Sequence, residues 1–281
     1  MLYSYVAKRA EDGGWTGVSR FDAMLRRVFP GMRSMTLLPV MNGEDVVVTD
    51  NHLSCDVPER VETVVVHHGC AATHFSRDPQ WRTNGSRKAA DKQVKMFFKA
   101  NRRWVAPSAW VADEFSKVIP DRMREVNVIP HWVQPISPLA RQGKPRIIGD
   151  WRDHNKGAIV WRKLAERYSQ WEFQPLNFRD DAGRCKQYGE ASLYLCLSLS
   201  EGGAYSVCDA EAAELPIVTT DVGNYREFKD CEVIRWQDRN DLEAVGAAIE
   251  RKLKAGRCLP SFYRDYTFEH WVGLWREVVA Q

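Results

Sequence analysis

Two kinds of hydrophobic pattern alternate along the chain. Short apolar runs typical of strands occur at residues 2–7 (LYSYVA), 45–50 (DVVVTD), 61–69 (VETVVVHHG) and 191–199 (ASLYLCLSL). Other segments repeat apolar residues every three or four positions, as helices do, and one of them carries Val18, Phe21, Met24, Leu25 and Val28. This alternation predicts an α/β protein.

Residues 198–228 (SLSEGGAYSVCDAEAAELPIVTTDVGNYREF) predict a strand, a tight loop and a helix. The apolar run ending at Leu199 leads into Gly202-Gly203, and glycines permit the backbone conformations of a tight turn. Residues 205–214 have helical spacing, and Pro216 ends that pattern. Amides at a helix N-terminus attract anions, and in a parallel sheet this turn lies where ligands bind. We therefore expect the loop to bind a phosphate group.

The composition narrows the class of protein. A chain of 281 residues can form two domain cores, and 44% hydrophobic with 27% charged residues is typical of globular proteins. Met1 is followed directly by a predicted strand and no apolar run reaches the length of a membrane span, so we expect a cytoplasmic protein, peripheral on the inner membrane face at most. The seven cysteines form no C-x-x-C pair, which favours reduced thiols over zinc binding.

The stretch from Ser198 to Glu227 resembles the nucleotide-sugar-dependent glycosyltransferases of the GT-B fold, family 4 in particular. Members carry a glutamate before a glycine-rich loop, a second glutamate eight positions later, an Ala-rich helix, a Pro-Val-Val strand and a Gly-Gly-x-x-Glu turn. This chain has Glu201, Gly202, Asp209, Pro216-Ile217-Val218 and Gly223 to Glu227 in the matching places. It departs from the pattern in the shorter Asp209, in Gly203-Ala204 instead of Phe-Gly, and in Glu214 instead of glycine.

The resemblance implies two Rossmann-like domains that face a cleft. Residues 1–135 would form an acceptor-side domain and residues 136–262 a nucleotide-sugar-binding domain. Residues 263–281 would form a C-terminal helix that crosses back to the first domain. Prolines and a glycine in residues 130–145 mark the linker.

The implied reaction is the transfer of a sugar from a nucleoside diphosphate donor to a hydroxyl group, with retention of configuration. No cofactor is implied besides this co-substrate, and no Asp-x-Asp stands at a strand end to bind a metal. The family pattern assigns the sugar hydroxyls to Glu201, the ribose to Asp209 and the diphosphate to Lys156. The family's diphosphate arginine falls on Asp150, so Arg152 would substitute for it. The remaining donor-side candidates flank the two glycine loops: Gly14, Gly202, Gly203, Ala204 and Tyr205.

A histidine at the end of the strand at residues 61–69 is the other implied catalytic group. Family members place such a histidine against the donor sugar, and both His67 and His68 qualify. We favour His68 because it stands directly before Gly69. A strand-terminal histidine with no catalytic role is the alternative.

Residues 77–103 form a basic segment with nine Lys/Arg and two Asp. Helical spacing predicts an apolar stripe (Ala90, Val94, Phe97 and Phe98) opposite a cationic face (Lys88, Lys92, Lys95, Lys99 and Arg102). Such a face is either merely solvated or docks a polyanion, and Trp15 would contact the acceptor from the first glycine loop. We favour a lipid-linked or saccharide acceptor. DNA with hydroxymethylated bases is the alternative acceptor. Two alternatives to an active transferase also stay open: a catalytically inactive GT-B binding subunit and a nucleic-acid-binding protein without transferase activity. The oligomeric state stays open.

Overall fold

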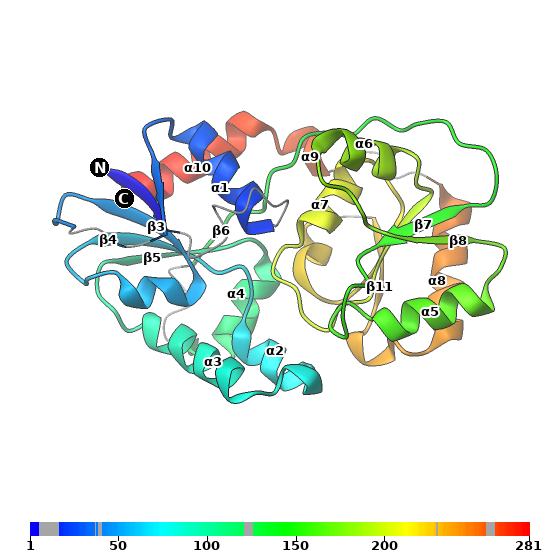
Figure 1. The fold of residues 1–281 in the computed structure, drawn as a ribbon, viewed down its shortest axis with the longest axis horizontal. Helices are drawn as coiled ribbons and strands as arrows, with labels where there is room; N and C mark the ends of the chain where they lie inside the picture. Colours follow the sequence, from blue (N-terminus) through cyan, green and yellow to red (C-terminus); the bar gives the residue numbers. More distant parts are fainter. Residues whose placement is uncertain (6–16, 37, 39–40, 121–125, 229, 257–261) are drawn as a thin grey trace. The chain divides into compact units, whose positions relative to one another are not determined.

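The computed structural model describes residues 1–281 except 6–16, 37, 39–40, 121–125, 229 and 257–261. The chain divides into two compact units (Figure 1). The first unit contains Met1–His131 together with Phe268–Gln281, and the second contains Trp132–Thr267. Each unit is built on one sheet, and the described strand pairings in both are parallel.

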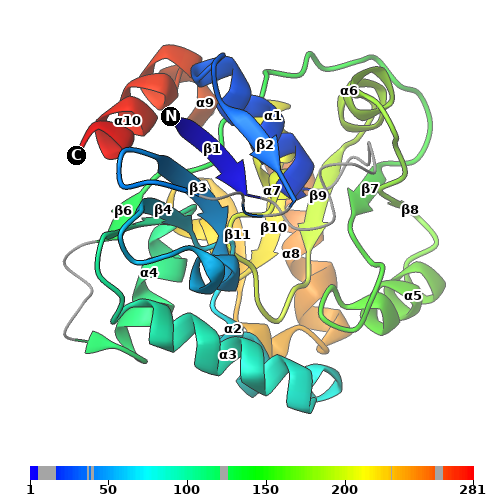
Figure 2. The ribbon, with the colours of Figure 1, turned by 60° about the vertical axis from the view of Figure 1, so that its left-hand side comes forward.

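The sheet of the first unit has six strands in the order β2-β1-β3-β4-β5-β6. These strands are β1 (Leu2–Tyr5), β2 (Arg33–Met35), β3 (Val46–Asp50), β4 (Glu62–Val66), β5 (Arg102–Ala106) and β6 (Val126–Val128). The helices are α1 (Gly17–Val28), α2 (Ala71–Arg77), α3 (Asn84–Met96), α4 (Ala109–Ser116) and α10 (Phe268–Ala280), with 3₁₀ turns η1 (Asn51–Asp56) and η2 (Pro79–Trp81). In Figures 1 and 2, α1 and α10 lie on one side of this sheet and α2 and α3 on the other.

The C-terminal helix α10 is part of the first unit. It packs on α1, where the rings of Phe21 and Trp275 lie 5.4 Å apart. Arg103 of β5 donates hydrogen bonds to the carbonyl oxygens of Val278 and Val279, at 3.2 and 2.9 Å. Cations near a helix C-terminus satisfy carbonyl groups that have no partner within the helix. The helix is therefore anchored to the sheet through its own last turn.

The sheet of the second unit has five strands in the order β11-β10-β9-β7-β8. They are β7 (Arg146–Gly149), β8 (Glu172–Pro175), β9 (Leu193–Cys196), β10 (Ile217–Thr220) and β11 (Cys231–Ile234). The helices are α5 (Ala158–Arg167), α6 (Asp181–Gly189), α7 (Tyr205–Ala212), α8 (Leu242–Ala255) and α9 (Phe262–Asp265), with 3₁₀ turns η4 (Gly223–Arg226) and η5 (Trp236–Asp238).

Close packing at the end of β7 requires a glycine. A Cβ atom at Gly149 would lie 2.2 Å from the carbonyl oxygen of Leu195 and 2.4 Å from the ring of Trp161. Trp161 and Leu195 are fully buried members of the core between this sheet and α5 and α8. Because Gly149 has no side chain, the end of β7 can pack closely against both β9 and the ring of Trp161.

The architecture confirms the predicted fold class of two Rossmann-like parallel α/β sheets with a C-terminal helix in the first unit. One local expectation was wrong. Helical spacing placed Phe98 in an apolar stripe, but α3 ends at Met96 and the Phe98 side chain is 65% exposed. Phe97, which belongs to the same predicted stripe, follows the last helical residue and is buried as expected.

Candidate functional site

The strand order of the second unit places two loops side by side. The chain leaves β7 toward β8 on one side, whereas β9 leads to β10 on the other, so connections diverge between β7 and β9. Ligands of parallel α/β sheets bind at this kind of switch point, beyond the carboxyl ends of the strands. The loop after β7 carries Lys156, and the loop after β9 carries Glu201.

Lys156 and Glu201 form an ion pair across these loops, with the ammonium Nζ against the carboxylate Oε1. The hydroxyl of Ser198 donates to the same Oε1 at 2.7 Å, and the carboxylate of Asp150 lies 3.9 Å from Nζ. The two paired side chains are 15% and 12% exposed, so both reach solvent. The Lys156–Glu201 pair therefore presents a cation and a carboxylate at the sheet edge, each of which can be offered to a ligand.

The charges around Lys156 favour its protonated form. Burial disfavours the ammonium ion, but the negative charges of Glu201 and Asp150 outweigh burial and raise the pKa of Lys156 above its ordinary value. The side chain is therefore a fixed cation at neutral pH. A cation held in a partly desolvated site attracts an anion more strongly than one in bulk water.

Arg152 belongs to the same cluster through Asp150. Its Nε and Nη2 donate to the two carboxylate oxygens of Asp150, at 2.8 and 2.6 Å, in a bidentate pair. Burial alone would raise the pKa of Asp150, but the hydrogen bond from Arg152 and the charge of Lys156 lower it. Asp150 stands where the family has an arginine. Its carboxylate orients Arg152, the residue that we expected to replace that arginine.

The glycine loop lies directly beside this cluster. Gly202 and Gly203 are buried, and α7 begins at Tyr205 after Ala204, whose methyl side chain cannot cap the helix. The turn after β10 closes on the loop at Gly223, which has φ +66°, and a Cβ there would lie 3.1 Å from the Cβ of Glu201. The loop is therefore held between two strand ends, with the N-terminus of α7 behind it.

Asn155 joins the two loops through hydrogen bonds to the backbone. Its side chain donates to the carbonyl oxygen of Ser200 and accepts from the Ser200 amide, both at 3.1 Å. Its own carbonyl oxygen accepts from the amide of Leu199 at 2.9 Å. We did not predict this role, although an asparagine one position before the matched lysine was visible in the sequence.

Asp209 lies away from this cluster in a buried ion pair. Its Oδ1 accepts a hydrogen bond of 2.8 Å from Nη1 of Arg184 on α6, and the Asp209 side chain has no exposed surface. Arg184 also binds Asp181 in the first turn of α6. A carboxylate can accept several hydrogen bonds, so the pairing with Arg184 does not decide the ribose role, and the assignment of ribose to Asp209 stays a prediction.

The two neighbouring histidines of the first unit have different surroundings. The ring of His67 is fully buried, stacked on Phe97 at 5.0 Å and close to Trp104 and Phe115, and neither ring nitrogen has a hydrogen-bond partner among the described residues. Burial, assisted by the nearby His68, lowers the pKa of His67 to about 3, so its ring is neutral. His67 therefore acts as a core residue in this structure.

His68 is half-buried, and its Nε2 lies 2.8 Å from Oδ1 of Asp50. Asp50 ends β3, the strand next to β4, so the two side chains meet at one edge of the sheet. The rings of Phe21 and His131 pack beside His68, at 5.2 and 5.7 Å. We had not singled out Asp50, although two successive apolar runs that end near Asp50 and His68 were visible in the sequence.

The basic face is smaller than the sequence predicted. Lys88, Lys92 and Lys95 are exposed on α3 together with Arg87. Lys99, beyond the end of the helix, donates to the carbonyl oxygen of Cys55 at 2.8 Å. Arg102 lies in β5 and donates to several carbonyl oxygens, among them those of Val57 and Val61. Extrapolating helical spacing past Met96 caused this error. Gly14 and Trp15 lie outside the described residues.

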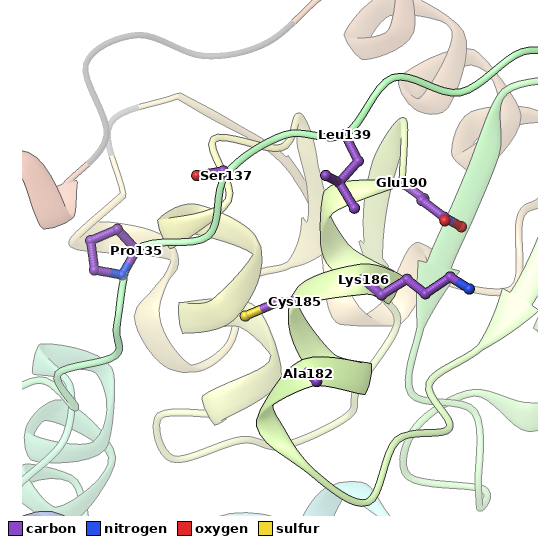
Figure 3. A pocket seen from close by; sticks show the side chains of 7 residues that line it. All are labelled: Pro135, Ser137, Leu139, Ala182, Cys185, Lys186 and Glu190. Atoms are coloured by element: carbon purple, nitrogen blue, oxygen red, sulfur yellow. The ribbon is translucent and has the colours of Figure 1, made fainter.

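A pocket of about 500 Å³ lies elsewhere in the second unit, between α6 and the segment that leads into β7 (Figure 3). It is lined by Pro135, Ser137, Leu139, Ala182, Cys185, Lys186 and Glu190. It shares no residue with the Lys156–Glu201 cluster.

Comparison with known proteins identifies the fold. The chain matches no protein-family model and no curated protein by sequence. It is similar to HepE of Anabaena, solved with UDP and glucose, at 11% identity and a TM-score of 0.70 over 100% of this chain and 99% of that one. Sucrose-phosphate synthase of Thermosynechococcus elongatus is similar at 14% identity and a TM-score of 0.57, over 84% and 68% of the chains.

TarM, a protein of S. aureus, is similar at 12% identity and a TM-score of 0.57. The match covers 85% of this chain but 55% of TarM, so the chain spans about half the length of that protein. These likenesses show that the chain has the GT-B fold of nucleotide-sugar glycosyltransferases.

Two further observations concern ligands and membranes. In the described part of the chain, no group of three or more His, Cys, Asp or Glu side chains is placed to hold a metal ion. No helix among the same residues has both the length and the apolar character needed to cross a bilayer.

Proposed function

We propose that this protein is a retaining glycosyltransferase that moves a sugar from a nucleoside diphosphate to a hydroxyl acceptor. The observation that carries the proposal is the Lys156–Glu201 pair at the switch point of the second sheet. A sugar nucleotide needs a cation for its diphosphate and a hydrogen-bond acceptor for its sugar hydroxyls. The pair supplies both groups from adjacent loops.

Donor binding would exchange the partners of this pair. The diphosphate replaces Glu201 as the counter-ion of Lys156, and the carboxylate that is released accepts hydrogen bonds from the sugar. The N-terminus of α7 adds positive potential, whereas the charge of Arg152 is balanced by Asp150 until the diphosphate competes for it. Negative charge grows on the diphosphate as it leaves, so cations fixed in advance lower the barrier.

His68 would serve the sugar or acceptor from the first unit. Nε2 of His68 lies 2.8 Å from Oδ1 of Asp50, so the carboxylate orients the ring through one nitrogen, and Nδ1 is the nitrogen through which the ring would act. His67 offers no comparable group, because its ring is enclosed by aromatic side chains. His68 is therefore the histidine that we assign to the reaction.

Fewer residues of the structure bear on the identity of the acceptor than on that of the donor. Lys88, Lys92, Lys95 and Arg87 are exposed on α3, and the exposed Phe98 lies just beyond the helix end. Cations beside an exposed aromatic ring suit an anionic lipid surface, where rings insert and lysines meet head groups. We therefore favour a lipid-linked or saccharide acceptor. DNA with hydroxymethylated bases is the alternative acceptor, and it would need only the charges.

A donor screen tests the proposal. UDP-glucose is the first candidate, because the similar HepE structure contains UDP and glucose. Thermal melting with each common nucleoside diphosphate sugar should identify one that raises Tm, and the same donor should be hydrolysed or transferred. A protein that binds a donor but never releases the nucleotide would be the inactive binding subunit. Absence of any Tm shift across the panel would refute nucleotide-sugar binding.

A further inference from the structure

Arg239 lies beneath the two loops that carry Lys156 and Glu201. It stands between η5 and α8, and it is 4% exposed. Its Nη1 donates hydrogen bonds of 2.9 Å to the carbonyl oxygens of both Asn155 and Leu197. Its Nη2 donates a hydrogen bond of 3.0 Å to the carbonyl oxygen of His154.

These acceptors belong to both loops of the site. His154 and Asn155 directly precede Lys156, whereas Leu197 begins the loop that reaches Glu201. The guanidinium group is planar and its donors have fixed directions, so binding both loops at once fixes their separation. Removing this group would leave carbonyl oxygens of both loops without these donors in a largely desolvated place.

The two loops also touch each other at Leu197, one of the residues whose carbonyl oxygen accepts from Arg239. Gly157 has φ +81°, and a Cβ there would lie 2.9 Å from the Cβ of Leu197 and 3.1 Å from its carbonyl oxygen. The hydrogen bonds of Asn155 join the loops nearer to Glu201. Arg239 therefore supports a junction that continues upward to the Lys156–Glu201 pair.

We propose that Arg239 is a positioning residue that holds the Lys156 loop and the Glu201 loop in register for sugar transfer. The proposal rests on the function proposed above. Arg239 acts through the loop backbones, and Lys156 and Glu201 alone would meet the donor. Reacting groups tolerate little displacement, because a misplacement of about 1 Å can slow a reaction about 100-fold.

The test compares three variants of the full chain. Arg239→Gln removes both the positive charge and the planar guanidinium group with its several donors. Arg239→Lys keeps a cation that reaches fewer carbonyl groups. Arg235→Gln is the matched control, because Arg235 precedes the same turn but its side chain is 75% exposed and pairs with Asp238 on the surface. Thermal melting first establishes that each variant is folded.

The first readout requires no catalytic activity. Hydrogen exchange of the ligand-free protein reports the amides of Leu199 and Ser200, which donate to Asn155. We expect these amides to exchange faster in Arg239→Gln, while amides of β7 and β9 keep their wild-type rates. Arg235→Gln should exchange as the wild type does.

The second readout is steady-state kinetics with the donor from the Tm screen. Arg239→Gln should lower kcat about 100-fold with a smaller change in donor KM, and Arg239→Lys should recover part of the loss. Because Arg239 acts on the placement of Lys156, Arg239→Gln combined with Lys156→Ala should be about as slow as the slower single variant.

Three results would overturn the proposal: exchange in Arg239→Gln equal to that in Arg235→Gln, a kcat equal to the control, or a double variant whose losses multiply. If Arg239→Gln does not fold, Arg239→Lys decides by the same two measurements. A wild-type protein that turns over no donor contradicts the proposed function, and the exchange data then decide alone whether Arg239 holds the loops.

Discussion

Arg184 on α6 and Asp209 on α7 form an ion pair inside the second unit, with Nη1 2.8 Å from Oδ1 and side-chain exposures of 2% and 0%. The pair joins two helices of the unit by a charge-assisted hydrogen bond. Asp209 stands where the family motif has a longer glutamate, and its carboxylate is directed to Arg184. Its structural role and its predicted ribose role can therefore be separated by experiment.

Asp209→Ala should lower the free energy of unfolding by about 3–5 kcal/mol, because it leaves the buried guanidinium of Arg184 without this carboxylate. Urea unfolding followed by circular dichroism measures the loss. Asp181→Ala is the matched control, because Asp181 binds the same arginine but is 54% exposed, and it should change stability by less than about 1 kcal/mol.

Replacing both partners, as Arg184→Met with Asp209→Leu, should restore most of the stability, because neither charge then remains buried. Calorimetric titration of this stable variant with the nucleoside diphosphate tests the ribose role. We expect weaker binding than in the wild type. Equal affinity would show that Asp209 serves packing between α6 and α7 alone.

Lys156→Ala and Glu201→Gln should each lower the transfer rate ~100-fold or more, because each removes one charge aimed at the donor. Rates are measured as nucleoside diphosphate released and sugar transferred. Lys163→Ala, which changes an exposed lysine of α5, should leave the rate unchanged. Near-normal turnover in either site variant, with a normal melting curve, would contradict the assignment of Lys156 and Glu201 to the donor site.

His67 should make the protein less stable in mild acid. Its pKa is about 3 in the folded protein, against an ordinary value of 6.5, so between these values the unfolded chain binds a proton that the folded chain does not. The contribution of the neutral His67 ring to the free energy of unfolding is fully present above about pH 6.5. It is lost as the pH falls toward 3, by up to about 1.4 kcal/mol per pH unit.

Urea midpoints between pH 7.5 and 5 measure this dependence, and His67→Phe should flatten it because the ring no longer titrates. His270→Gln, at an exposed histidine of α10, is the control and should retain the wild-type slope. An unchanged slope in His67→Phe would mean that other groups, such as the buried His131, carry the acid sensitivity.

The exposed lysines of α3 should attract an anionic membrane. Changing Lys88, Lys92 and Lys95 to Gln should weaken binding to vesicles containing phosphatidylserine, and the wild-type affinity should fall with added salt. A charge-matched control changes three exposed cations of the second unit to Gln: Arg162, Lys163 and Lys254.

Duplex DNA in the same salt series tests the alternative acceptor. Stronger binding to DNA than to vesicles would favour the DNA acceptor. Binding to neither surface, together with full activity of the triple variant, would show that the cationic face is only solvated.

The loops of the candidate site depend on local order. A strand that runs into a glycine turn before a helix predicted the loop at Gly202, and the family resemblance selected Glu201 there and Lys156 in a similar loop; the roles of both residues stay predictions. Both patterns are contiguous, so the residues need no distant partner to be recognised. Parallel topology then places the two loops at neighbouring strand ends.

The remaining features depend on contacts between distant segments. The pattern left both His67 and His68 as candidates and favoured His68 only for its place before Gly69, because the aromatic rings that enclose His67 come from distant segments. Arg184 and Arg239 were not singled out, since nothing nearby in sequence marks them as buried. The ends of helices were equally obscure: the helical spacing of α3 continues in the sequence to Arg102, although the helix stops at Met96.

The place of α10 has a consequence for the order of folding. A ribosome makes the strands of the first unit, then the whole second unit, and only afterwards the helix whose carbonyl groups bind Arg103. Until then the surface of α1 around Phe21 lacks its contact with Trp275. Domains tend to fold as they emerge, so the second unit, though later in the chain, can be completed while the first still awaits its closing helix.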